Sequence, residues 1–186
     1  NNTGVSQTGT TTLQLDGSVN LVGHDINGTN NMIDKILVNS GTVTLSESQV
    51  TSGTVVVNGA GSAVVEVSAS SSANYATILA LDTAANETIK FTGNSTFTGN
   101  FGDSNIVVNS GVTVTTDASI VSGKTVSGTG ILSVTNLDAT LSASFANVNP
   151  TTLNVDWSGT GTQTYLGNLT NVDTLTVTSG TMQVDA

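Results

Sequence analysis

One short segment of the chain occurs three times, and each copy contains a Ser-Gly pair. The copies are Ile36–Thr42, Ile106–Val112 and Leu175–Thr181, so the intervals between their first positions are nearly equal. Each is a β-type run rich in Val, Leu and Ile that ends at Ser-Gly, and another β-type run follows it. A repeated strand-and-turn unit is typical of stacked β-architectures, in which each unit buries its apolar side only against its neighbours. The repeat therefore favours an elongated structural module over a globule built around a pocket.

Short alternating runs occupy most of the chain, and Gly, Asn, Ser or Asp separate them as turn residues do. Helical periodicity is nearly absent. The one ambiguous segment is 73–86, within which we expect a strand at 77–81. The other predicted strands are 11–15, 19–22, 36–45, 54–57, 63–67, 88–91, 106–108, 112–115, 131–134, 153–157 and 173–177.

A second similarity sets the length of the unit. Asn147–Val155 resembles Asn171–Val177 when an insertion is allowed in the first copy, and the distance from Asn147 to Asn171 is taken as one unit. The longer intervals between the Ser-Gly copies are close to three such units. We predict an all-β β-solenoid (β-helix) of about eight coils with about 20–24 residues each, a rod about 40 Å long at the usual strand spacing. Repeats of a β-sandwich are the alternative fold. Pro150 lies in the divergent copy, where a turn or edge tolerates the loss of an amide donor.

The charge of the chain restricts its partners. The net charge is −10, with three lysines (Lys35, Lys90 and Lys124) and no arginine. So few cations cannot neutralise phosphates, which excludes nucleic acid, or form a polybasic patch for anionic lipid. No apolar run is long enough to span a bilayer, so we expect no direct membrane insertion.

The composition also indicates a compartment. Roughly half of the residues are Thr, Ser, Asn or Gly, cysteine is absent, and only 9% are charged, against about 25% in ordinary soluble domains. Aromatic residues are only 4%, so we expect a narrow core of aliphatic side chains. Cysteine-free chains of this kind are common among extracellular repeat proteins. The chain starts at Asn1 without a signal peptide, and neither end resembles a cap. We therefore expect residues 1–186 to be a single solenoid segment, excised from a larger protein.

Residues suited to catalysis are sparse. His24 is the only histidine, whereas a nucleophilic relay needs an activated serine beside it and a histidine zinc site needs several ligands. We interpret His24 as a turn residue. Paired carboxylates serve glycoside hydrolysis, but the chain offers almost no aromatic platform for a sugar. We expect the protein not to be an enzyme and its carboxylates to lie in turns. The carboxylates considered are Asp16, Asp25, Asp34, Asp103, Asp156 and Glu66.

Calcium is the cofactor that the sequence favours most, although no motif fixes it firmly. Residues 99–106 loosely match the Gly-Gly-x-Gly-x-Asp nonapeptide of calcium β-rolls and place Asp103 and Asn105 as candidate ligands. Asp25 and Asn27 place oxygen ligands at alternate positions but lack the glycine and closing glutamate of an EF-hand loop. Structural turns are the alternative reading of both segments.

Thr-x-Thr pairs offer a further alternative. They occur at Thr42/Thr44, Thr113/Thr115, Thr174/Thr176 and Thr176/Thr178. Flat threonine arrays bind ice when they repeat strictly on one face, and these copies are irregular. Outward threonines on ordinary strands are the simpler interpretation.

Two segments of the sequence resemble a known class of proteins. Leu169–Gly180 and Ile106–Gly111 resemble the repeats of bacterial surface-layer (S-layer) proteins and related large type I-secreted proteins. Their composition and loose repeats are also similar to those of the β-helical passengers of autotransporter adhesins. The resemblance implies an extracellular β-solenoid, self-assembly into a lattice and, often, calcium-dependent order. The tandem calcium nonapeptides and a segment that anchors to lipopolysaccharide are not recognisable here.

We therefore expect a structural protein of the bacterial cell surface that forms part of a surface layer. Its partners would be lattice neighbours of the same kind and adjacent domains of the same chain. The first alternative is an adhesin passenger, for which a long protruding loop near 68–74 would be typical. The second alternative is a carbohydrate-active β-helix enzyme, which needs two carboxylates about 5–9.5 Å apart in a groove.

Overall fold

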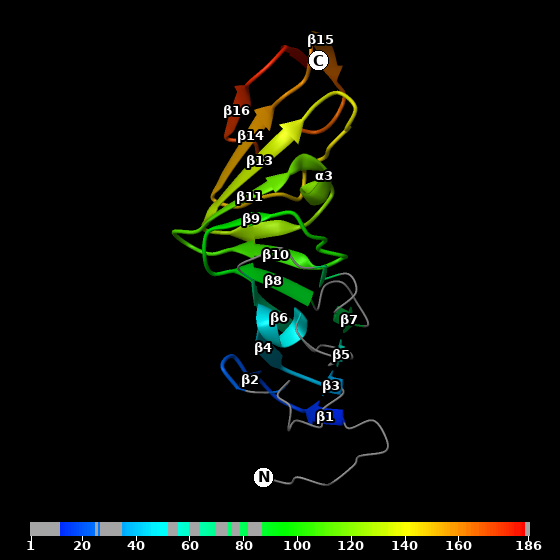
Figure 1. Cartoon of the computed structure of the whole chain (residues 1–186), viewed down its shortest axis with the longest axis vertical. Helices are drawn as coiled ribbons and strands as arrows, with labels where there is room; N and C mark the ends of the chain where they lie inside the picture. Colours follow the sequence, from blue (N-terminus) through cyan, green and yellow to red (C-terminus); the bar gives the residue numbers. More distant parts are fainter. Residues whose placement is uncertain are drawn as a thin grey trace.

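The chain forms a stack of parallel β-coils. The computed structural model describes residues 12–24, 26, 35–51, 56–59, 64–69, 74–75, 79–81 and 87–184. The coils follow one another along a single long axis, with the N-terminal coils at one end and the C-terminal coils at the other (Figure 1). About seven turns of a β-solenoid result, so the predicted fold class is confirmed with one coil fewer than expected.

Four sheets run along the stack, and every strand pairing in the described part of the chain is parallel. A β-sandwich, whose sheets are antiparallel, does not describe this topology. The four-stranded sheet consists of β1 (Thr12–Leu15), β3 (Lys35–Val38), β5 (Val56–Gly59) and β7 (Leu79–Leu81). The six-stranded sheet consists of β2 (Val19–Asn20), β4 (Thr42–Ser46), β6 (Val64–Ala69), β8 (Glu87–Phe91), β10 (Asn105–Val108) and β12 (Val126–Gly128). The five-stranded sheet consists of β9 (Ser95–Phe97), β11 (Thr113–Asp117), β13 (Ile131–Leu137), β14 (Thr152–Trp157) and β16 (Thr174–Val177). The two-stranded sheet consists of β15 (Thr162–Tyr165) and β17 (Thr181–Val184).

The coils shorten along the stack. Up to β8 the partners in a ladder are widely separated in sequence, as in the pairs Lys35–Val56 and Val19–Val43. From β8 onward the separations are mostly smaller, and the shortest step joins Thr88 to Asn105. The predicted unit of about 20–24 residues holds for most of these steps but not for the shortest one. Near the C-terminal end of the stack the step is shorter than the interval from Asn147 to Asn171, because Val155 pairs with Leu175.

Alternate side chains of each strand seal the interior. In the central column, Leu45, Val67, Ile89, Ile106 and Val126 lie one above another and are 0–1% exposed. Each fully buried aliphatic side chain contributes about 1.5–3 kcal/mol relative to the exposed state. The outward residues between them are partly exposed, which is the alternation that the sequence predicts.

The aromatic residues correct the expectation of a purely aliphatic core. All seven are buried: Tyr75, Phe91, Phe97, Phe101, Phe145, Trp157 and Tyr165. Four of them form one cluster, in which Phe97 stacks on Phe101 with ring centroids 4.0 Å apart and Phe91 meets both edge-on. Tyr75 also stacks with Phe97, with ring centroids 6.3 Å apart. The cluster fills the interior at the coil where the four-stranded sheet ends and the five-stranded sheet begins.

Each Ser-Gly copy forms a corner between two strands. Gly41, Gly111 and Gly180 have φ values of 78°, 75° and 71°, a left-handed conformation that glycine adopts without strain. The corners join different sheets, however: β3 to β4, β10 to β11, and β16 to β17. The repeated segment is therefore a general corner element and does not stack in one column.

In the described part of the chain, the short helices α1 and α3 interrupt the strands where the periodicity predicts none. At the start of helix α1 (Glu47–Thr51) the Ser46 amide donates to Gln49 Oε1 at 2.7 Å, which is one of the two hydrogen bonds of a capping box. Gln49 Nε2 also donates to the carbonyl oxygens of Leu21 and His24 in the preceding coil, at 2.6 and 2.7 Å. Helix α3 (Ala118–Val121) is capped by the Asp117 carboxylate, which accepts from the Ser119 amide. Both helices fill corners of the coil.

Candidate functional site

The outward side of the five-stranded sheet carries a straight column of small polar side chains. Its members stack one per coil in register: Thr96, Thr115, Ser133, Asn154 and Thr174. On the inner strands of the sheet they alternate with fully buried residues, which fixes their outward direction. We call these five residues the hydroxyl column. The strands that carry it lie above one another in Figure 1.

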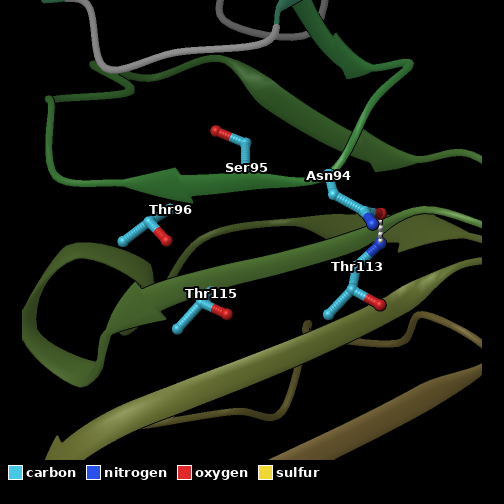
Figure 2. A pocket seen from close by; sticks show the side chains of 5 residues that line it. All are labelled: Asn94, Ser95, Thr96, Thr113 and Thr115. Carbon is cyan, nitrogen blue, oxygen red and sulfur yellow. Dashed lines mark hydrogen bonds between the residues drawn. The ribbon is translucent and has the colours of Figure 1, made fainter.

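A shallow hollow lies at the β9 end of this column. It has a volume of about 290 Å³ and is lined by Asn94, Ser95, Thr96, Thr113 and Thr115. Figure 2 shows Thr96 and Thr115 side by side on the two neighbouring strands. The Asn94 side chain is held in place because its Oδ1 accepts from the Thr113 amide at 2.8 Å (Figure 2). The hollow offers hydroxyl groups and threonine methyl groups, and its lining contains no ionisable side chain.

A second hollow, of about 450 Å³, lies beside helix α3. It is lined by Gly99, Asn100, Ser119, Ile120, Ser122 and Lys124. The Lys124 ammonium donates to the Gly102 carbonyl oxygen, so its charge is held by the backbone of the preceding coil. Neither of the two described hollows contains a carboxylate, which a glycoside hydrolase needs in a pair.

The structure describes only half of the predicted calcium ligands. Asp103 is exposed in a turn, and Asn105 begins β10 and pairs with Thr88. Asp25 and Asn27 lie outside the described residues. Within the part of the chain that is described, no three His, Cys, Asp or Glu side chains converge on one point. Calcium binding therefore stays a prediction, with Asp103 and Asn105 as its described candidates.

The single histidine lies in a turn, as predicted from the sequence. His24 is exposed, its amide donates to the Leu21 carbonyl at 3.0 Å, and its own carbonyl accepts from Gln49. The first hydrogen bond closes the turn, and the second connects the turn to Gln49 in the next coil.

The carboxylates considered for catalysis that the structure describes are dispersed over the rod. Asp16 is an exposed turn residue whose Oδ1 accepts from Asn39 Nδ2 at 2.7 Å. Glu66 faces outward from β6 and pairs with Lys90 of the next coil at 3.4 Å. Asp156 faces outward from β14. Asp25 and Asp34 lie outside the described residues.

A carboxylate that the sequence analysis did not consider lies inside the coil. Glu87 is 8% exposed, directly above Val65 in an inward column, and Ser104 donates to its Oε2 at 2.8 Å. The signal was present in the sequence, because Glu87 precedes the inward Ile89 by two positions. A carboxylate buried to this extent and held by Ser104 is placed as part of the interior and not on a binding surface.

Two stacked aspartates were also missed. Asp117-Ala118-Ser119 and Asp138-Ala139-Thr140 form the same turn one coil apart, with the aspartate Oδ1 accepting from the amide and hydroxyl two positions on. Hydrogen bonds from Thr140 lower the pKa of Asp138. Partial burial acts to raise the pKa of Asp117, but hydrogen bonds from Ser119 and Asn136 outweigh it and leave that pKa lowered. The repeated Asp-Ala-Ser/Thr triplet was the available signal. These carboxylates stabilise a corner.

The loop that would favour an adhesin lies mostly outside the described residues. Ser68 and Ala69 belong to β6, and Asn74 forms a parallel bridge with Asn100, but residues 70–73 are not described. No described helix has the length and apolar character needed to cross a membrane.

Comparison with known proteins gives no relative for this chain. No family model matches it, and neither a curated protein nor a solved structure is significantly similar.

Proposed function

We propose that this chain is a structural segment of a bacterial cell-surface protein and a building block of an extracellular surface layer. The proposal rests on one observation, the in-register parallel stack whose inward side chains are almost completely buried. Such a stack is a rod with repeating outer faces, and a rod of this kind suits a spacer or a lattice element. Neither of the two hollows described is an apolar cavity of the kind that small ligands usually occupy.

The outer surface suits repeated weak contacts. Its exposed strand positions are mostly Thr, Ser and Asn, whose side chains both donate and accept hydrogen bonds. One such bond contributes only about 1 kcal/mol, but a two-dimensional array repeats it many times. All seven aromatic side chains are buried, so the surface offers no ring on which a sugar could stack. This supports a structural role over carbohydrate binding or cleavage.

Electron microscopy of the full-length protein, with and without a calcium chelator, tests the proposal. We expect ordered two-dimensional arrays at the cell surface and in reassembled material. Arrays that dissolve on chelation would add calcium as the metal that orders the lattice. Isolated fibres on the cell surface, without lateral order, would support an adhesin and contradict the lattice role.

A further inference from the structure

The hydroxyl column lies in an uncharged region of an acidic molecule. The neighbouring outward column on the same sheet consists of Thr113, Ile131 and Thr152, and it is also uncharged. Asp117 and Asp156 lie along one margin of this face, and Asp173 lies at the opposite margin, where its Oδ2 accepts from the Leu153 amide. The net charge of the chain is −10, so two copies repel each other least where both present uncharged residues. By contrast, the outward side of the six-stranded sheet carries Glu66 and Lys90.

The same face is complementary to itself. Threonine and serine hydroxyls and the Asn154 amide each supply hydrogen-bond donors and acceptors. Two identical columns can therefore form hydrogen bonds with each other, and no differently composed partner surface is needed. Both copies have the same spacing of about 4.8 Å between successive coils, because that spacing is set by the β-ladder. A contact made at one coil is therefore available again at the next.

A protruding apolar residue lies next to the hollow on this face. Ile131 is 38% exposed on β13, although large apolar residues elsewhere on this sheet's central strands are buried. It pairs in register with Thr113 of β11, and Thr113 lines the hollow. A two-fold axis that runs along the strands between β11 and β13 would place Ile131 of each copy over the hollow of the other.

We infer that the outward face of the five-stranded sheet is the surface on which a second copy of this chain packs side by side, with Ile131 inserted over the hollow lined by Thr96, Thr113 and Thr115. This inference rests on the proposed lattice function and identifies one of its interfaces. A polysaccharide is a poorer occupant, because the face has hydroxyl groups but no exposed aromatic ring. A basic partner is poorer as well, because the acidic groups lie at the margin and not at the centre.

Sedimentation velocity on the full chain, over a range of protein and salt concentrations, tests the inference. The variants are Ile131→Asp and Thr115→Asp, which place a carboxylate within the contact. The matched controls are Val107→Asp and Ser127→Asp, outward residues of β10 and β12 on the six-stranded sheet. Circular dichroism checks that all four variants keep the wild-type fold.

We expect the wild-type chain to associate, and to do so more tightly at higher salt because screening reduces the repulsion between acidic copies. The Ile131 and Thr115 variants should raise the dissociation constant at least tenfold, while the controls change it less than threefold. If the wild-type chain associates and the Ile131 and Thr115 variants associate equally well, this interface is wrong and the lattice function stands. If the wild-type chain stays monomeric and forms no arrays, both fail. Binding of a soluble polysaccharide that the Thr115 variant abolishes, with no self-association, would also overturn the inference.

Discussion

The corner glycines offer a matched test of how the coils pack. Gly41 and Gly111 occupy the same place in two copies of the repeated segment, and their φ values are 78° and 75°. Their surroundings differ. A Cβ on Gly41 would lie 2.6 Å from both Gly17 C and Ser18 N of the preceding coil, whereas a Cβ on Gly111 would meet nothing within 4 Å. Alanine therefore meets the same backbone strain at both positions and a backbone clash at only one.

The magnitudes follow from this difference. An alanine in the left-handed conformation destabilises the folded state by about 1–2 kcal/mol. Replacing glycine also lowers the conformational entropy of the unfolded chain, which offsets about 0.4–1 kcal/mol of this cost. Gly111→Ala should thus destabilise the protein by about 0–1.6 kcal/mol. At Gly41 the clash forces the preceding corner to move, and overpacking of this kind costs about a further 1–3 kcal/mol. Gly41→Ala should therefore destabilise by about 1–4.6 kcal/mol.

Urea unfolding followed by far-ultraviolet circular dichroism measures both values. Hydrogen exchange at β1–β4 adds a local measurement, because coils far from the substitution report it weakly in a stacked repeat protein. Equal losses for the two variants would refute the reasoning, since the strain that they share would then explain everything. A neutral Gly41→Ala would show that the two corners do not lie in contact.

The remaining predictions concern the core and the ionisable groups. Ile89→Ala, in the buried central column, should lower the free energy of unfolding by about 2–5 kcal/mol. Leu166 is 69% exposed, so Leu166→Ala should change the free energy of unfolding by less than about 0.5 kcal/mol. Similar losses for the two variants in urea unfolding would contradict the burial of Ile89 in the central column. Thr140→Ala should raise the pKa of Asp138 toward 3.8, because it removes the hydroxyl donor that lowers that pKa; carboxyl-carbon NMR titration measures the shift, and an unchanged pKa would argue against the turn. The contribution of Asp138 to wild-type stability should be lost as the pH falls from 3.8 through the lower pKa of the folded state. Burial raises the pKa of Tyr165 to about 12. The free energy of unfolding should therefore fall as the pH rises from 10 toward 12, because in this range the Tyr165 hydroxyl ionises only in the unfolded chain. Tyr165→Phe should reduce this pH dependence in urea titrations, and an unaltered dependence would contradict the assignment.

The fold was predictable because strand alternation and turn residues agree along most of the chain. Most strands with Val, Ile or Leu at alternate positions were found from the sequence alone, but the run 36–45, predicted as one strand, forms β3 and β4 on either side of the Gly41 corner. Strands β9, β12, β15 and β17 were missed because they are short and mostly polar, as in Thr162–Tyr165. Their β-structure comes from pairing with the neighbouring coil, a tertiary effect that local pattern does not report.

The site was less predictable than the fold. The sequence indicated that Thr and Ser face outward, but not that Thr96, Thr115 and Ser133 share a column. That column depends on the length of each coil, and the step from Val65 to Glu87 is longer than the step from Thr88 to Asn105. Coil length in turn depends on corner residues such as those of α1 and α3, whose capping interactions were not anticipated.

The staggered ends of the sheets have a mechanical consequence. The four-stranded sheet stops at β7 and the five-stranded sheet starts at β9, while the six-stranded sheet continues past both from β2 to β12. The continuous sheet thus overlaps the ends of the two others and connects them. A force along the long axis would pass between the two halves of the stack mainly through β6, β8 and β10. The aromatic cluster fills the interior beside these strands and would support them where the other two sheets end.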